Sequence, residues 1–194
     1  AKKKAKHPKF CYYAMKKLSV LAFAFISASA GMAQRQPVDY VSTLVGTQST
    51  FQLSTGNTYP ATAMPWGMNF WTPQTGKMGD GWTYGYQANK IRGLKQTRQP
   101  SPWINDYGQL SVMPITRRND FTEERRRSWF SHKTEVTLPH YYHAYLGDVQ
   151  TNVELTPTER AAAFRMRFNG GDSAYVVIDA CNGGSYVKLI PDRK

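Results

Sequence analysis

The chain has 194 residues and carries 25 Lys and Arg against 13 Asp and Glu, which gives a formal net charge of +12. Its hydrophobic content of 41% and aromatic content of 13% exclude an intrinsically disordered protein. Two cysteines exclude a disulfide-rich scaffold, and the length suits one domain with a sizeable core. The charge alone favours a nucleic acid or an anionic membrane surface as partner, so its distribution along the chain matters.

The first 33 residues have the layout of a secretory signal peptide preceded by a basic segment. Met15 is followed by two lysines, an apolar run over 18–28 and the small-residue cleavage pattern Gly31-Met32-Ala33. The apolar run is shorter than the roughly 20 residues of a transmembrane helix, and a buried helix is the remaining alternative. We expect residues 1–14 to be an upstream non-native or over-called segment, 15–33 to be the signal peptide and 34–194 to be the mature, secreted or periplasmic domain.

Removal of residues 1–33 lowers the net charge and thereby changes which partners the charge predicts. Residues 1–33 hold seven lysines and no acidic residue, so the mature segment keeps 18 basic and 13 acidic residues, a net charge of +5. That charge requires neither a nucleic acid nor, after signal cleavage, a membrane as partner. Cys181 remains as the single cysteine, so we expect no internal disulfide in an oxidising compartment.

From Gln34 onward, short runs of β-branched and aromatic residues alternate with turn-forming residues, at 147–148 and 169–172 among other places. Over 162–168, three apolar side chains share one face and two arginines share the other, as in a half-buried strand. No window predicts an amphipathic helix of ten residues or more. The pattern predicts an all-β, antiparallel sandwich with strands at 38–45, 67–71, 82–86, 109–115, 128–136, 141–146, 149–155, 162–168 and 174–180.

The stretch from Thr47 to Trp103 differs from the rest, because it is long, poor in periodicity and dense in aromatic and amide side chains. We interpret it as functional loops. Aromatic rings beside amides and hydroxyls suit sugars, whose C–H faces pack on rings while their hydroxyls need hydrogen-bonding partners. The alternative, that most of these rings belong to the core or to a domain interface, stays open.

The other residue patterns give weaker support for a functional site. Three histidines, His132, His140 and His143, have no cysteine or carboxylate at zinc-ligand spacing, so we interpret them as structural or surface residues. The triplet 125–127 is basic, but Glu123 and Glu124 beside it favour a solvated face or loop over a nucleic-acid patch. No nucleophile elbow, P-loop or dinucleotide fingerprint is present, and no carboxylate pair is placed for glycosidase chemistry.

A series of motifs resembles glycoside hydrolase family 92, whose members are mainly exo-acting α-mannosidases. The order and spacing of the motifs are kept across nearly all of residues 38–180. The motifs are VDYVSTLVGT at 38–47, GNTYPATAMPWGM at 56–68, GWTYGY at 81–86, QPSPWINDYG at 99–108, YYHAYL at 141–146 and ELTPTER at 154–160.

The resemblance implies an N-terminal β-supersandwich, similar to galactose mutarotase, that precedes a catalytic α/α barrel. In the family the general acid, the catalytic base and the calcium ligands come from the barrel, so we expect calcium in the parent enzyme and no catalytic or metal-binding residue in this chain. The N-terminal module lends loop residues to the rim of the active site. By motif position, the expected substrate-binding residues are Trp82, Tyr84, Gln99, Trp103 and Asp106.

The resemblance therefore implies an incomplete N-terminal domain of a secreted, calcium-dependent, inverting exo-α-mannosidase acting on N-glycans or mannan. Its expected partners are mannose-containing glycans and a downstream α/α-barrel domain of the same protein. The sequence KQTRQPSP at 95–102 departs from the Ser/His-rich loop commoner in the family, so α-1,2 specificity does not follow. The alternative is a stand-alone carbohydrate-binding module without enzymatic activity.

Overall fold

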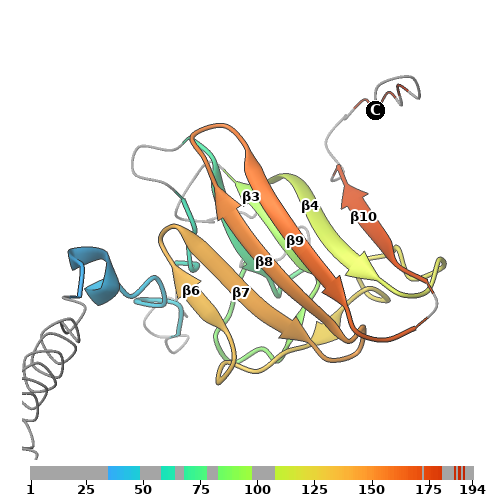
Figure 1. Cartoon of the computed structure of the whole chain (residues 1–194), viewed down its shortest axis with the longest axis horizontal. Coiled ribbons are helices and arrows are strands. Elements are labelled where there is room, and N and C mark those ends of the chain that lie inside the picture. The colour runs from blue at the N-terminus through green and yellow to red at the C-terminus, as the bar shows by residue number, and fades with distance from the viewer. Residues whose placement is uncertain are drawn as a thin grey trace, which may run out of the picture. The chain divides into compact units, whose positions relative to one another are not determined.

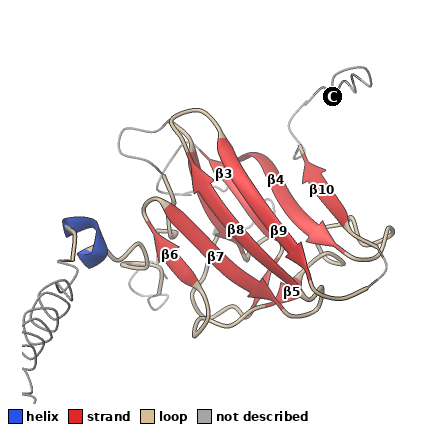
Figure 2. Ribbon diagram, viewed as in Figure 1, coloured by secondary structure: helices blue, strands red, loops and turns tan. Residues whose placement is uncertain are grey.

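The computed structural model describes residues 35–48, 58–63, 68–77, 83–97, 108–171 and 173–180, together with Tyr186, Lys188 and Ile190. The expected signal peptide lies outside these residues. The chain divides after Pro37 into two units, and every described strand belongs to the second unit, Val38–Lys194. Apart from the short 3-10 helix Pro37–Tyr40, drawn blue, the described part of this unit consists of strands and loops in Figure 2. Within the described residues no helix is long and apolar enough to cross a membrane.

The described residues of this unit form two four-stranded sheets and one short strand pair, and every pairing among them is antiparallel. The first sheet has the order β1 (Phe70–Gln74), β3 (Gly93–Thr97), β4 (Gly108–Ile115), β10 (Tyr175–Asp179). The second has the order β6 (Val136–Leu138), β7 (Tyr141–Leu146), β8 (Thr151–Pro157), β9 (Ala162–Phe168). The pair joins β2 (Lys90–Ile91) to β5 (Ser128–Trp129). In Figure 1 the sheet β6–β9 lies in front of β3 and β4, which is the expected sandwich.

The core lies between the two sheets. Along β7, Tyr142, Ala144 and Leu146 are buried while the residues between them are partly exposed, as the period of two requires. The Trp71 ring of β1 meets the Phe164 ring of β9 edge-on, with centroids 5.0 Å apart. Both sheets supply the buried cluster, whose members include Leu94, Val112, Ile115, Val153 and Leu155.

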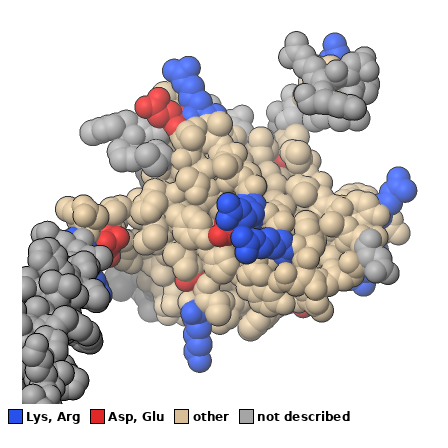
Figure 3. Space-filling view, viewed as in Figure 1, with Lys and Arg blue, Asp and Glu red and all other residues tan. Residues whose placement is uncertain are grey.

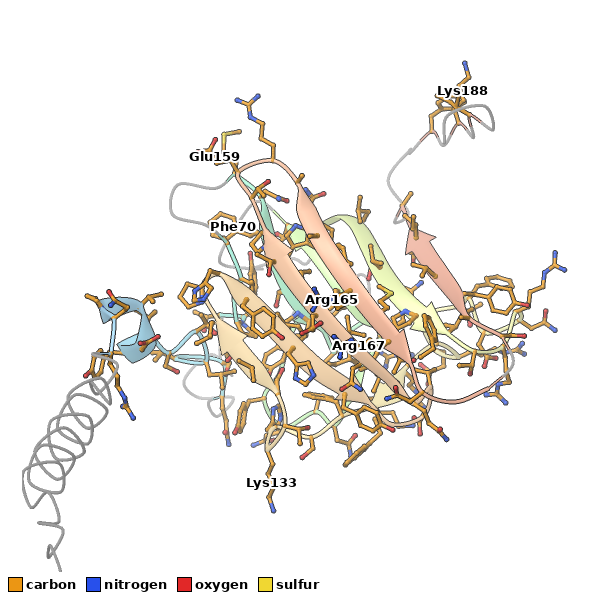
Figure 4. All side chains as sticks on the ribbon, in the orientation of Figure 1. Phe70, Lys133, Glu159, Arg165, Arg167 and Lys188 are labelled. Atoms are coloured by element: carbon orange, nitrogen blue, oxygen red, sulfur yellow. The ribbon has the colours of Figure 1, made fainter. Side chains whose placement is uncertain are left out.

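Strand β9 has the predicted two-faced character. Its seven residues pair with β8 without a register shift, and the partly buried Phe164 and Met166 pack on the core. Arg165 and Arg167 lie exposed on the opposite face, where Figure 4 labels them. On the face shown in Figure 3, two basic side chains lie together at the centre and the other Lys and Arg groups lie apart near the edges.

The strands predicted from the sequence agree with the structure where apolar and polar residues alternate regularly. The ranges 141–146 and 162–168 are confirmed to the residue, and 109–115 and 174–180 correspond closely to β4 and β10. The strand predicted at 149–155 begins two residues later, because residues 147–150 form a turn in which Gln150 has a φ of 47°. The predicted strand 67–71 corresponds to β1, which begins at Phe70 and continues through Pro73. Because β1 is an edge strand, the missing N–H of Pro73 is tolerated.

Other predicted strands are wrong. Residues 38–45 form a 3-10 helix (Pro37–Tyr40) and turns, because local bonds such as Val41 N–H to the Val38 carbonyl (3.2 Å) replace a ladder. Residues 128–136 separate into β5 and β6, since the Ser131 carbonyl accepts the N–H groups of Thr134 and Glu135 in a turn. Strands β1, β2 and β3 lie in the stretch interpreted as loops. Strand β3 has four of its five residues buried, so it shows no alternation.

Candidate functional site

The structure describes one of the five expected substrate-binding residues. Trp82, Gln99, Trp103 and Asp106 lie outside the described residues. Tyr84 is described and only 1% exposed, so its ring lies in the interior and offers no face to a ligand. It belongs to the segment 83–86, which was predicted to continue a strand and is instead a bend followed by a turn. Of the five expected rim positions, only Tyr84 in this segment therefore has a described environment.

Backbone bonds tie the segment 83–86 to the end of β1. The N–H groups of Thr75 and Gly76 both donate to the Thr83 carbonyl, at 2.9 and 3.1 Å. The N–H of Gly85 donates to the Thr75 hydroxyl at 2.9 Å. These bonds join the end of β1 to the segment that follows Trp82 in the sequence. A residue expected to contact substrate is thus attached directly to a fixed segment.

A partly exposed histidine, paired with a buried glutamate side chain, holds the other side of the segment. His132 and Glu135 lie in the turn between β5 and β6, near the labelled Lys133 in Figure 4. The His132 Nδ1 lies 2.6 Å from the Glu135 Oε2, and the Glu135 side chain is only 2% exposed. The His132 Nε2 lies 2.6 Å from the Tyr86 carbonyl oxygen. The imidazole stacks on the Tyr86 ring with centroids 4.1 Å apart, and Phe130 packs edge-on at 4.8 Å.

The hydrogen-bond partners of the His132 imidazole show which ring nitrogen must carry a hydrogen. A carbonyl oxygen can only accept, so the His132 Nε2 carries a hydrogen and donates to Tyr86. The Nδ1 faces a carboxyl oxygen, so a second proton lies between Nδ1 and Glu135 Oε2, on one atom or the other. In both arrangements the bond to the Tyr86 carbonyl is kept. The pair is therefore a clamp on the segment 83–86 that does not depend on which partner holds the second proton.

Two tyrosines complete the surroundings of the Glu135 carboxyl. The Tyr142 hydroxyl donates to Glu135 Oε1 at 2.9 Å. The Tyr84 hydroxyl is buried without a well-formed hydrogen bond. Burial raises the pKa of Tyr84, and the neighbouring Glu135 charge raises it further. Burial and the same carboxylate hold the pKa of Tyr142 well above its usual value. Both hydroxyls therefore stay protonated and neutral at physiological pH.

The sequence model of the glycosyl hydrolase family 92 N-terminal domain matches residues 40–192. The chain belongs to family 92. The match covers all ten strands of the sandwich and the segment 83–86. Among curated proteins, none matches the chain.

Solved structures of the family share the fold of this family 92 domain. The inverting mannosidase BT2199 of Bacteroides thetaiotaomicron VPI-5482 is 45% identical, with a TM-score of 0.69 over 77% of this chain and 21% of that one. The α-mannosidase BT3965 of Bacteroides thetaiotaomicron is 28% identical, with a TM-score of 0.65 over 76% of this chain and 20% of that one. The chain thus spans about a fifth of the length of the solved relatives it matches.

The basic triplet of the family 92 domain is not uniformly solvated. Arg125 and Arg127 are exposed, as expected, but Arg126 is buried. The Arg126 guanidinium donates to the carbonyls of Arg92 and Phe121 and, at 2.7 Å, to the Asp179 carboxylate. A buried guanidinium needs such acceptors. Arg126 therefore anchors the 121–127 loop to the sheet and does not form part of a nucleic-acid patch.

The described residues of the family 92 domain offer no ready metal site. No three His, Cys, Asp or Glu side chains among them lie close enough together to hold an ion. Of the histidines expected to be structural or surface residues, His132 is the structural one described above. His143 lies on the outer face of β7, with Nε2 3.3 Å from the Asn152 amide oxygen. No residue of this part of the chain is assigned to calcium.

Sequence reasoning missed Glu135 and the clamp it forms. One signal was present, since the alternation of YYHAYL places the Tyr142 side chain in the core. A buried tyrosine hydroxyl needs an acceptor nearby, which directs attention to the few acidic residues close in sequence. The bond from His132 to the Tyr86 carbonyl could not be read in this way, because it joins positions 46 residues apart.

Proposed function

We propose that this chain is the N-terminal, substrate-rim domain of a secreted, calcium-dependent, inverting exo-α-mannosidase that acts on N-glycans or mannan. The observation that carries the proposal is the family 92 N-terminal match over 40–192, together with 45% identity to the inverting mannosidase BT2199. The 20–21% coverage of the solved relatives leaves ample length for a separate catalytic module. In this proposal, that module is an α/α barrel.

The role of this domain is recognition. The indole rings of Trp82 and Trp103 pack on the C–H faces of mannose residues, and the polar groups of Gln99 and Asp106 bond their hydroxyls. The Tyr84 ring is buried, so its part in this role is packing inside the domain and not a contact to the sugar. Calcium, when bound by the catalytic module, supplies a Lewis-acid contact to a sugar diol. No group of three His, Cys, Asp or Glu side chains among the described residues is placed to hold it.

Hydrolysis by the protein carrying both modules tests the proposal. With an aryl α-mannoside as substrate, we expect activity in the presence of calcium, loss of activity in chelator and recovery when calcium is restored. Calcium-independent hydrolysis contradicts the cofactor assignment. The absence of hydrolysis with any α-mannoside contradicts the mannosidase assignment itself.

The alternative function is a carbohydrate-binding module that works by itself, which the aromatic density between Thr47 and Trp103 favours. Titration calorimetry of this chain with mannobiose and N-glycans separates the two. A binding heat from the chain alone, of the same affinity as in the longer protein, supports the stand-alone module. A glycan affinity present only in the longer protein supports the rim domain.

A further inference from the structure

We propose that a basic hollow between the 116–127 loop and the turn at 147–150 binds the phosphate or sulfate group of an anionic sugar. The hollow has a volume of about 440 Å³, within the roughly 300–1,000 Å³ of small-molecule sites. Five basic residues line it, namely Lys90, Arg117, Arg125, Arg126 and Arg127. That the ligand is a sugar rests on the proposed function, whereas the preference for an oxyanion rests only on the residues of the hollow.

The acidic residues that line the basic hollow are already paired with basic ones. The pairs are Arg117–Asp120 at 2.7 Å, Arg127–Glu124 at 2.8 Å and Lys90–Asp148 at 3.5 Å. The bond from Arg92 at 2.8 Å and the charge of Arg127 lower the pKa of Glu124, so its carboxyl stays ionised and bound to them. Among the described residues, no three His, Cys, Asp or Glu side chains lie close enough together to hold a metal ion. The lining therefore does not suit a cation.

The basic residues of the hollow outnumber its acidic ones, and Arg125 carries the excess charge. The Arg126 guanidinium pairs with Asp179, which does not line the hollow. Arg125 is exposed, and no acidic side chain pairs with it in the part of the chain that the structure describes. The ion pairs of Arg117 and Arg127 each use one nitrogen, Nε in the first and Nη1 in the second, although a guanidinium carries five N–H donors. Further donors and one positive charge are therefore available to an anion.

The chemistry of these donors favours a tetrahedral oxyanion. The planar fork of a guanidinium matches two oxygens of a phosphate or sulfate group, and such charge-assisted bonds are the stronger kind. Nonspecific nucleic-acid binding instead uses several phosphate contacts along an extended basic surface, and the single charge excess here favours one anionic group. The Arg117 and Arg127 side chains are 81% and 40% exposed, so solvent ions screen the attraction and binding should weaken as the salt concentration rises.

Titration calorimetry of this chain with mannose 6-phosphate, mannose 6-sulfate, mannose and inorganic phosphate tests the proposal. We expect both esters to bind at least about tenfold more tightly than mannose, and less tightly when salt is raised from about 20 mM to about 200 mM. Backbone amide NMR shifts at 116–127 and 147–150 should locate the site. No binding of either ester, or shifts confined to other segments, overturns the proposal. Equal affinity for inorganic phosphate and mannose 6-phosphate overturns the assignment to a sugar and supports the oxyanion site.

Two double variants separate the hollow from the net charge of the chain. Arg125→Gln with Arg127→Gln removes two charges from the hollow. Arg165→Gln with Arg167→Gln is the matched control, because it removes two exposed arginines at the same spacing from β9, labelled in Figure 4. Thermal midpoints should be nearly unchanged in both variants, since the substituted side chains are exposed.

We expect the variant of the hollow to weaken binding of mannose 6-phosphate about tenfold or more, and the β9 variant to leave it within about twofold. Equal losses in the two variants overturn the site, because net charge then governs binding. Tighter binding of a short DNA duplex than of mannose 6-phosphate, lost in the variant of the hollow, assigns the site to nucleic acid and overturns the sugar. If the esters bind in the hollow while the protein carrying both modules hydrolyses no α-mannoside, the proposed function has failed and the oxyanion site has not.

Discussion

Trp71 of β1 and Phe164 of β9 meet edge-on across the sandwich, with an interplanar angle of 79°. The contact joins strands from different sheets that are more than ninety positions apart in the sequence, and the Trp71 Nε1 also donates to the Asn69 side chain at 2.9 Å. Asn69 in turn donates to the carbonyl of Ala161 at 2.8 Å, just before β9 begins. This set of contacts fixes the spacing of the two sheets at one end of the sandwich.

Truncation of Phe164 should therefore be costly. We expect Phe164→Ala to lower the free energy of unfolding by about 3–4 kcal/mol, because the deletion leaves a cavity against the Trp71 ring. Phe164→Leu should cost about 1 kcal/mol. Chemical denaturation measures both. Phe121→Ala is the control, since Phe121 is 60% exposed and its removal should change stability by less than about 0.5 kcal/mol. Equal losses at Phe164 and Phe121 would contradict the assigned packing.

Removing the charge of Asp179 and removing the charge of Arg126 should have different effects on the stability of the fold. The Arg126 side chain is 1% exposed and that of Asp179 is 29% exposed. Asp179→Asn leaves the buried guanidinium with its carbonyl partners and the more distant Glu123 carboxylate at 3.9 Å, and should cost about 1–3 kcal/mol. Arg126→Met removes the buried charge and replaces its volume, and it should cost less than Arg126→Ala. Thermal or urea unfolding of the three variants decides the order. A larger loss in Arg126→Met than in Arg126→Ala would contradict this account.

Strand β10 should promote self-association of this chain. By register, Val176 and Ile178 lie opposite Pro114 and Val112, on the side of the sheet that faces the core. They are nevertheless 50% and 70% exposed, because the facing sheet ends at β9. An exposed apolar edge strand is a template for pairing with another copy. We expect Val176→Lys with Ile178→Lys to lower the average mass in sedimentation velocity at high concentration.

Met68→Lys is the control for this change, since Met68 is 85% exposed and lies outside β10. It adds a positive charge without altering the edge strand. If Met68→Lys disperses the chain as well as the double variant does, net charge and not β10 governs association.

Alkaline pH should destabilise the fold through its buried tyrosines. Burial raises the pKa of Tyr59 to about 12, although its weak bond to the Thr97 hydroxyl at 3.5 Å acts in the opposite direction. The unfolded chain releases this proton near pH 10. The contribution of Tyr59 to stability is therefore complete below pH 10 and is lost between pH 10 and 12, by about 3 kcal/mol. Tyr84 and Tyr142, whose pKa values are also raised, act in the same direction.

Urea unfolding at pH 9, 10, 11 and 12 measures this dependence. Tyr59→Phe should have a smaller decline over the interval, because the variant lacks one of the titrating groups. A free energy of unfolding that stays constant up to pH 12 would show that these hydroxyls are not buried as described.

Much of the fold could be predicted from residues whose pattern is local. Strands β7 and β9 alternate cleanly because one face is buried and the other meets solvent, so their bounds were predicted to the residue. Strand β3 could not be found this way, because Lys95 and Thr97 are buried on one face while Leu94 is buried on the other. The segment 38–45 has strand-like composition, but Val41 and Val45 are exposed, and the Val41 N–H bonds to the nearby Val38 carbonyl instead of joining a ladder.

The candidate site was less predictable than the fold. The motif GWTYGY places Tyr84 in the family pattern, yet its burial depends on Glu135 and Tyr142, which come from other elements. The contact between His132 and the Tyr86 carbonyl joins two turns, and no periodicity records it. The identity of the family follows from motif order, whereas the clamp follows only from the three-dimensional arrangement.

The most direct test of the account is the stereochemistry of hydrolysis by the protein carrying both modules. Proton NMR recorded in the first minutes of α-mannobiose cleavage identifies the anomer of the mannose released. An inverting α-mannosidase gives β-mannose first, with the α anomer appearing only by mutarotation, and chelator should stop the reaction. Release of α-mannose as the first product, or no cleavage with calcium present, would contradict the account.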